Sequence, residues 1–245
     1  MKNTINIRFY EELNLFLIPR KRKRPFDIEF TGRITIKDLI EAQQVPHTEV
    51  DLILANGISV SFNYIPSDGD RISVYPVFES LDISGITRLR PEPLREPKFI
   101  LDVHLGKLAK KMRMLGFDSL YRNDFEDDQI IKIALKEQRI ILTRDIGILK
   151  NRKVTHGFFV RPDQPDKQLG EVIRRFDLYG KFKPLNRCIA CNGAIKQVDK
   201  EEVIDRLQPK TRRYFEKIFI CSSCGKLYWE GSHFTNMMKK IEQLS

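Results

Sequence analysis

Four cysteines make up the whole thiol content of this 245-residue chain, and they form two CxxC pairs with 29 residues between them. The pairs are Cys188 with Cys191 and Cys221 with Cys224. Four thiolates at such spacing can converge on one tetrahedral Zn²⁺, and Gly193 and Gly225 supply flexible backbone just after each pair. The spacing therefore predicts a zinc ribbon. Because four thiolates fill the coordination sphere, we expect a structural zinc and look for chemistry elsewhere.

The surrounding sequence favours metal binding over the other uses of a CxxC pair. The alternative is a redox motif or a disulfide, but neither a secretory segment nor a thioredoxin-like βαβ pattern surrounds the pairs. The N-terminus lacks the charged-then-apolar pattern of a signal peptide, and no apolar run approaches the roughly 18 residues of a membrane helix. We therefore expect a cytoplasmic protein that makes no membrane contact.

Carboxylates follow two predicted strands and precede a predicted helix. Asp102 lies in the apolar stretch 99–103, Asp145 follows 140–144, and the acidic cluster is 124–128. Acids that converge at the carboxyl ends of parallel strands would repel one another unless Mg²⁺ or Mn²⁺ binds their oxygens. Such a cation would support phosphodiester hydrolysis. Alternatively, each Asp is a helix N-cap, and the residues alone leave both interpretations open.

The net charge of +10 is concentrated in the second part of the chain. Residues 1–97 hold 13 Lys and Arg against 14 Asp and Glu, whereas residues 98–245 hold 30 against 19. A basic field of this size favours a polyanion, and RNA or DNA is the usual one, although some basic proteins bind no nucleic acid. The second part is therefore the predicted nucleic-acid-binding surface.

Residues 1–80 predict a small sheet with one helix. Apolar residues alternate at 5–9 and 26–30, and the basic run 20–24 is expected in a solvated hairpin loop, with a phosphate contact as the less favoured interpretation. A helix is expected between Thr35 and Pro46, followed by strands at 51–55 and 71–75. The predicted order is ββαββ.

This segment resembles the ubiquitin-like β-grasp domains of the sulfur-carrier type, and the run 53–77 carries the likeness. Those carriers end in a free Gly-Gly, whereas this chain continues through 78–81 without a diglycine. We therefore expect a docking module for a protein partner. Residues 81–97 contain three prolines among charged residues and predict an extended linker.

Residues 98–180 alternate strands with helices. Strands are expected at 99–103, 119–121, 140–143 and 157–160. The alternation predicts a parallel sheet with flanking helices. Residues 181–245 hold the ribbon and tail, so the expected fold class is α/β with a β-grasp domain, a parallel-sheet domain and a zinc ribbon.

Two groups of motifs resemble the Mut-seven C-terminal ribonuclease family of PIN-like domains. The first comprises 100–109, 115–118, Asp127-Asp128 ahead of Ala134, and 142–145. The second comprises the cysteine pairs with Asn192 and Gly225, then 228–233 and Met237. A β-grasp module is a familiar N-terminal companion of that family, so the resemblance covers nearly the whole chain.

The resemblance implies a PIN-like, metal-dependent ribonuclease. It implies that Asp102, Asp127 and Asp145 hold the catalytic Mg²⁺ or Mn²⁺, with Asp128 or Asp124 as replacements for Asp127. Water would attack the phosphodiester, so no Ser or Cys nucleophile is needed. Because some PIN-like domains are inactive, the alternative is an RNA-binding adaptor that uses its PIN-like domain and ribbon for docking.

Basic side chains flank these acids. Lys107, Lys110 and Lys111 lie on one side of the helix after Asp102, where they either hold phosphates or form an ordinary solvated face. Arg144 is expected to contact phosphate or to pair with the acidic cluster.

The tail adds further candidates. Arg212 and Arg213 are expected phosphate contacts. Tyr228 and Trp229 could stack unpaired bases, but packing against the zinc knuckle is the favoured interpretation. His104 alone is a weak functional candidate.

Overall fold

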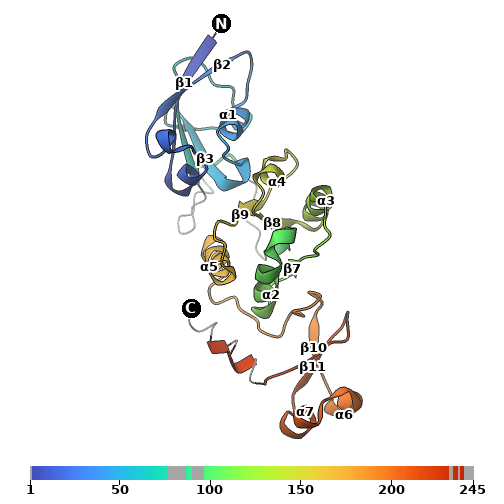
Figure 1. Ribbon diagram of the computed structural model, residues 1–245. Helices are drawn as coiled ribbons and strands as arrows, with labels where there is room; N and C mark the ends of the chain where they lie inside the picture. Colours follow the sequence, from blue (N-terminus) through green and yellow to red (C-terminus); the bar gives the residue numbers. More distant parts are fainter. Residues whose placement is uncertain (1, 77–86, 90–96, 232–233, 237, 240–245) are drawn as a thin grey trace. The chain divides into compact units, whose positions relative to one another are not determined.

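The computed structural model describes residues 2–76, 87–89, 97–231, 234–236 and 238–239. Most of the expected linker 81–97 lies outside these residues, as do His233 and Met237 of the tail. Contacts group the chain into two compact units, 1–96 with 134–159 and 97–133 with 160–245. Figure 1 shows the order of the elements along the chain.

The first unit is built on a five-stranded sheet with strand order β2-β1-β5-β3-β4. Its elements are β1 (Lys2–Phe9), β2 (Phe26–Thr31), α1 (Ile36–Ala42), β3 (Val50–Ala55), β4 (Ile58–Ser59) and β5 (Arg71–Pro76). Strand β1 pairs antiparallel with β2 and parallel with β5, and β3 pairs antiparallel with β5 and β4. The predicted ββαββ order is confirmed, with the two-residue strand β4 as an addition.

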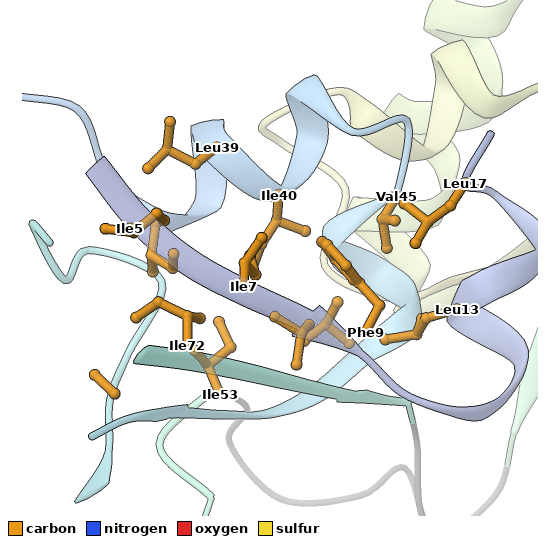
Figure 2. Packing of buried hydrophobic residues seen from close by; sticks show 14 of the residues in the cluster. Ile5, Ile7, Phe9, Leu13, Leu17, Leu39, Ile40, Val45, Ile53 and Ile72 are labelled. Carbon is orange, nitrogen blue, oxygen red and sulfur yellow. The ribbon is translucent and has the colours of Figure 1, made fainter. Parts of the chain in front are cut away.

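The core of this sheet follows from its sequence period. Ile5, Ile7 and Phe9 alternate along β1, so all three point to one face of the sheet and are buried there. Leu39 and Ile40 of α1 lie in the same core (Figure 2). Full burial of each such side chain contributes roughly 1.5–3 kcal/mol, which fixes α1 on the sheet.

The predicted hairpin between β1 and β2 is confirmed, and its basic run is largely exposed to solvent. The connection is more ordered than a loop, because it contains the 3-10 helices η1 (Glu11–Leu15) and η2 (Pro19–Lys21). Leu13 and Leu17 anchor it in the core. Arg22 Nε donates to the Leu17 carbonyl at 2.8 Å, and Lys21 Nζ donates to Gln43 Oε1 at 2.7 Å.

Residues 134–159 pack against the β-grasp sheet within the first unit. The elements involved are the end of α3 (Asp127–Glu137), β8 (Arg139–Thr143), α4 (Ile146–Lys150), β9 (Gly157–Phe159) and the 3-10 helix η3 (His47–Glu49). His47 Nδ1 lies 2.6 Å from Glu41 Oε1, and its Nε2 lies 2.7 Å from the Val154 carbonyl oxygen. The Glu49 carboxylate accepts a hydrogen bond from the Phe159 amide at 2.6 Å. Unpaired buried polar groups cost free energy, so these hydrogen bonds stabilise the contact between residues 47–49 and residues 154–159.

The second unit contains β6 and β7, two strands of the four-stranded parallel sheet that also includes β8 and β9. Its first elements are β6 (Lys98–Leu101), the 3-10 helix η4 (Val103–Leu105), α2 (Gly106–Met114), β7 (Ser119–Leu120), and later α5 (Pro165–Arg175). Strand β6 pairs in parallel with β7, as β8 does with β9, and the strand order of the sheet is β7-β6-β8-β9. The predicted parallel sheet with flanking helices is confirmed.

Helix α2 has a buried apolar face and ends at a glycine. Leu108, Ala109 and Met112 are buried on the face that packs toward α5. Gly116 stops the helix with φ +94°, a conformation that other residues rarely adopt. A Cβ at Gly116 would lie 2.0 Å from the Lys183 carbonyl oxygen, so the site requires glycine.

The C-terminal region forms a three-stranded antiparallel sheet of order β10-β11-β12. Its elements are β10 (Ile195–Val198), α6 (Lys200–Val203), the 3-10 helix η5 (Ile204–Arg206), α7 (Pro209–Tyr214), β11 (Ile218–Cys221) and β12 (Leu227–Trp229). Val203, Leu207 and Ile218 form its core, and Phe215 and Trp229 pack against them. Trp229 therefore packs against the apolar core of this sheet, whereas its predicted packing was against the zinc knuckle.

We expect His47→Ala to destabilise the first unit. Loss of the ring leaves the Glu41 carboxylate and the Val154 carbonyl without their imidazole partner, which should lower the free energy of unfolding by about 2 kcal/mol. Urea denaturation followed by circular dichroism measures the change. His104→Ala, at an exposed histidine, is the matched control. Identical urea midpoints for the two variants would contradict this role of His47.

Candidate metal and nucleic-acid sites

The four cysteine thiols form a compact cluster. Their sulfurs all lie within 4.8 Å of one another, with 3.6 Å between Cys188 and Cys224 and 3.5 Å between Cys191 and Cys221. Zn–S bonds of about 2.3 Å place the sulfurs of a tetrahedral site about 3.8 Å apart. The donor set and its spacing therefore suit zinc, and the cluster can hold one ion without an open position for a substrate.

Both cysteine pairs use the same backbone turn. The amides of Asn192 and Gly225 donate to the carbonyl of the first cysteine of their pair at 2.8 and 3.0 Å, and their φ angles are +70° and +69°. The left-handed residue after the first pair is thus Asn192, so the predicted role of Gly193 is wrong. Gly193 is needed for space instead, because a Cβ there would lie 2.4 Å from Ser223 Oγ.

The thiols differ in acidity. Burial opposes ionisation of Cys188, but the Tyr228 hydroxyl 3.0 Å away, together with neighbouring amide and thiol groups, outweighs burial and lowers the pKa of Cys188 to about 6. Burial raises the pKa of Cys191 to about 12, and the adjacent sulfurs reinforce the rise. Like charges crowded together favour a bound cation. The contact with Cys188 also confirms that Tyr228 packs against the knuckle.

Buried polar contacts join the first cysteine knuckle to the end of α2 and to β7. The Arg113 guanidinium is only 2% exposed and donates to the carbonyls of Ser119 at 2.8 Å and Ala190 at 2.9 Å. Asn192 accepts a hydrogen bond from the Ser119 amide at 2.8 Å and donates to Asp118 at 2.7 Å. Burial lowers the pKa of Arg113, while the cysteines and Asp118 favour its charged form. The ribbon is therefore anchored to the parallel-sheet domain within the second unit.

Asp102 follows β6 directly and stands at the N-cap position of η4, but its side chain makes no capping hydrogen bond. The residue is only 4% exposed. A buried carboxylate requires polar partners or a cation. The N-cap interpretation therefore holds for the position of Asp102 but not for its side chain, and its role as a cation ligand stays a prediction.

Asp145 follows β8 and does cap a helix. Its Oδ1 accepts a hydrogen bond from the Gly147 amide at 2.6 Å at the start of α4. The Asp145 amide in turn donates to Oγ1 of the buried Thr143 at 2.8 Å. The N-cap interpretation is correct for Asp145, and the Gly147 contact orients its carboxylate.

The aspartates of the acidic cluster lie in different local structures. Asp127 and Asp128 are exposed in the first turn of α3. Asp124 accepts two hydrogen bonds from the Arg122 guanidinium, at 2.9 and 2.6 Å, which hold the pKa of Asp124 below its usual range. Asp124 is therefore the weakest replacement for Asp127. The meeting of Asp102, Asp127 and Asp145 at one cation stays a prediction.

The lysines of α2 fall into two groups. Lys107 and Lys110 are exposed, whereas Lys111 is partly buried and pairs with Asp166 at 2.5 Å. Arg144 is partly buried beside Asp145 in the chain. Their contacts with phosphate stay predictions, and the ion pair of Lys111 makes it the weaker candidate.

The two tail arginines are exposed on α7. Arg212 donates to the Ile204 carbonyl at 2.6 Å, and the Arg213 guanidinium lies 5.5 Å from the centre of the Tyr214 ring. Their role as phosphate contacts also stays a prediction.

Comparison with known families identifies both parts of the chain. Residues 97–241 match the Mut7-C RNAse domain, and residues 2–82 match the Mut7-C ubiquitin domain. The chain belongs to the Mut7-C ribonuclease family. The predicted family and domain arrangement are confirmed, and membership indicates a nuclease or RNA-related function. No curated protein and no solved structure matches this Mut7-C chain significantly.

Sequence reasoning found the four clustered cysteines and the packing of Tyr228 but missed the polar contacts of Arg113 and Asn192. These two residues bond with partners up to 77 residues away, which no local pattern reveals. Within the part of the chain that the structure describes, no helix is both long and apolar enough to cross a bilayer.

Loss of one thiol should remove the metal and loosen the ribbon. We expect Cys221→Ser to reduce bound zinc, measured by mass spectrometry of the purified protein, at least about tenfold from one ion per chain. The neighbouring exposed Ser222→Ala variant should retain its zinc. Full zinc content in Cys221→Ser would contradict a four-thiolate site.

Asn192→Gly should separate metal binding from attachment of the ribbon. Glycine adopts φ +70° readily, so zinc content should not change, but the hydrogen bonds to Ser119 and Asp118 are lost. Hydrogen exchange of the Ser119 amide should accelerate about tenfold or more, while the amides of β1 serve as an internal reference. Unchanged exchange at Ser119 would show that Asn192 does not anchor the ribbon.

Proposed function

We propose that this protein is a metal-dependent ribonuclease that hydrolyses RNA phosphodiester bonds, with Asp102, Asp127 and Asp145 as ligands of Mg²⁺ or Mn²⁺ and Asp128 in reserve. Membership of a ribonuclease family supports the reaction class. The single observation that carries the choice of site is Asp102, a buried carboxylate at the end of β6 that caps no helix.

The strand ends supply the reason to group the acids. Asp102 and Asp145 each follow a strand of the same parallel sheet, and Asp127 begins a helix that precedes β8 in the chain. Carboxylate oxygens are the ligands that Mg²⁺ and Mn²⁺ prefer. A cation bound to them would polarise the scissile phosphate and lower the pKa of a bound water.

Protein side chains would position the cation and the RNA phosphates for hydrolysis. Burial holds Asp102 in one orientation, and the Gly147 amide holds one oxygen of Asp145. Preorganised ligands of this kind do not have to reorganise when the substrate binds. In the proposal, Lys107, Lys110 and Arg144 would hold the flanking phosphates.

The remaining parts would support the nuclease. Zinc in the four-cysteine cluster would stabilise the ribbon and its contact with β7, and the thiols require a reducing compartment such as the cytoplasm. Exposed Arg212 and Arg213 on α7 would extend the basic surface along the RNA. The ubiquitin-like domain would bind a protein partner.

Substitution of the acids tests the proposed site. Asp102→Asn and Asp145→Asn should each lower Mn²⁺-dependent cleavage of a labelled RNA at least about a hundredfold, because the amide removes a negative ligand. Asp124→Asn is the matched control, since Asp124 already pairs with Arg122 at the surface, and it should cleave as wild type does.

The outcomes separate the two candidate functions. Equal activity in wild type, Asp102→Asn and Asp145→Asn would reject the proposed site. Salt-sensitive RNA binding without turnover by any variant would instead identify an RNA-binding adaptor. Anomalous density from Mn²⁺-soaked crystals would test cation binding directly.

A further inference from the structure

A cavity of about 480 Å³ opens in the second unit beside the start of α2. Its walls include His104, Lys107, Lys110, Tyr121, Asp163 and Gln168. The volume falls within the range of small-molecule sites, which run from roughly 300 to 1,000 Å³. The lining combines cations, an aromatic ring and hydrogen-bonding groups, so a ligand with both an anionic and a flat part suits it.

Two lysines supply the positive charge of the cavity. Lys107 and Lys110 are three residues apart on α2, so their side chains share one helix face. Within the described ranges 2–76, 87–89, 97–231, 234–236 and 238–239, neither forms an ion pair, whereas Lys111 is engaged by Asp166 at 2.5 Å. The cavity therefore presents two ammonium groups able to hold a phosphate.

The aromatic wall is held in place by its surroundings. The Tyr121 hydroxyl donates to the Val103 carbonyl at 3.0 Å. Gly106 makes room for the ring, because a Cβ there would lie 2.6 Å from the Tyr121 oxygen. A half-buried ring that is held at its hydroxyl end offers a surface on which a nucleobase can pack.

Gln168 and Asp163 add polar groups to the cavity lining. Gln168 is only 5% exposed, and its Nε2 donates to the Pro162 carbonyl at 2.9 Å, which sets the orientation of the amide. Asp163 adds a carboxylate that can accept hydrogen bonds from a ribose hydroxyl or a base amine. A buried, oriented amide distinguishes this cavity from a patch of surface lysines.

We propose that this cavity is a subsite for one nucleotide of single-stranded RNA, with the phosphate on Lys107 and Lys110 and the base against Tyr121. The proposal rests on the proposed ribonuclease function and names the strand form that the enzyme takes. A paired base in a duplex is stacked and cannot enter such a cavity, so the subsite selects unpaired RNA.

Binding without cleavage tests the subsite. The probe is a fluorescein-labelled eight-residue oligouridylate, titrated by anisotropy with zinc-loaded protein and no added Mg²⁺ or Mn²⁺. The double variant Lys107→Gln/Lys110→Gln should weaken binding about tenfold or more. It should also reduce the slope of log K against log salt by about 0.7, the contribution of one single-strand phosphate contact.

The matched control removes the same charge elsewhere. Lys132→Gln/Lys136→Gln changes two exposed lysines one turn apart on α3 and should alter affinity less than about twofold. Equal losses in both double variants would show only a general basic field and would overturn the subsite, as would unchanged binding in the α2 variant.

The aromatic contact has its own pair of variants. Tyr121→Leu should weaken the oligouridylate about fivefold or more, whereas Tyr121→Phe, which keeps the ring, should bind within about twofold of wild type. Circular dichroism confirms that each variant folds. If Tyr121→Leu folds and binds the oligouridylate with wild-type affinity, the proposed packing of the base against Tyr121 is wrong.

Failure of the subsite differs from failure of the nuclease. With an active enzyme, the α2 double variant should raise KM for single-stranded RNA with kcat largely unchanged, whereas Asp102→Asn should lower kcat. Loss of binding in the α2 variant without turnover in wild type would retain the subsite and reject the nuclease. Normal KM in the α2 variant with active wild type would retain the nuclease and reject the subsite.

Discussion

The burial of the Arg113 guanidinium constrains much of the second unit. A cation that is almost fully removed from water must have its donors satisfied, and Arg113 meets this need with carbonyls from β7 and from the turn between Cys188 and Cys191. Those carbonyls converge only if the cysteine knuckle lies against the strand. The fold of the first cysteine turn and the packing of β7 beside α2 therefore depend on the same buried arginine.

The same arginine reaches the proposed RNA subsite. Its Nη2 lies 3.4 Å from the carbonyl oxygen of Tyr121, the residue whose ring forms the aromatic wall. The Arg113 guanidinium thus contacts the first cysteine turn, the short strand β7 and the backbone of Tyr121. Zinc bound by the four thiols would have no open position for catalysis, but it would support the backbone that carries the Tyr121 ring.

Sequence patterns predicted the elements whose physics is local. The period of two in β1 predicted which side chains are buried, and the CxxC spacing predicted the cluster of four thiols. Both predictions are confirmed, because each pattern reports the immediate surroundings of its residues. The same patterns gave a wrong assignment at Gly193, because the left-handed position of the knuckle is filled by Asn192 for its side chain. Sequence patterns also did not distinguish the two strand-end carboxylates. Asp102 and Asp145 both follow a strand, but only the Asp145 side chain caps a helix.

The contact between Glu49 and Phe159 has a consequence for solubility. Strand β9 is an edge strand of its sheet. The unpaired backbone groups of an edge strand can form hydrogen bonds with a strand of another chain. The Glu49 carboxylate occupies the Phe159 amide, and a charged group at that position repels an incoming strand. The ubiquitin-like domain thereby covers a backbone donor of the edge strand, and a fragment that lacks this domain would expose the Phe159 amide to pairing with another chain.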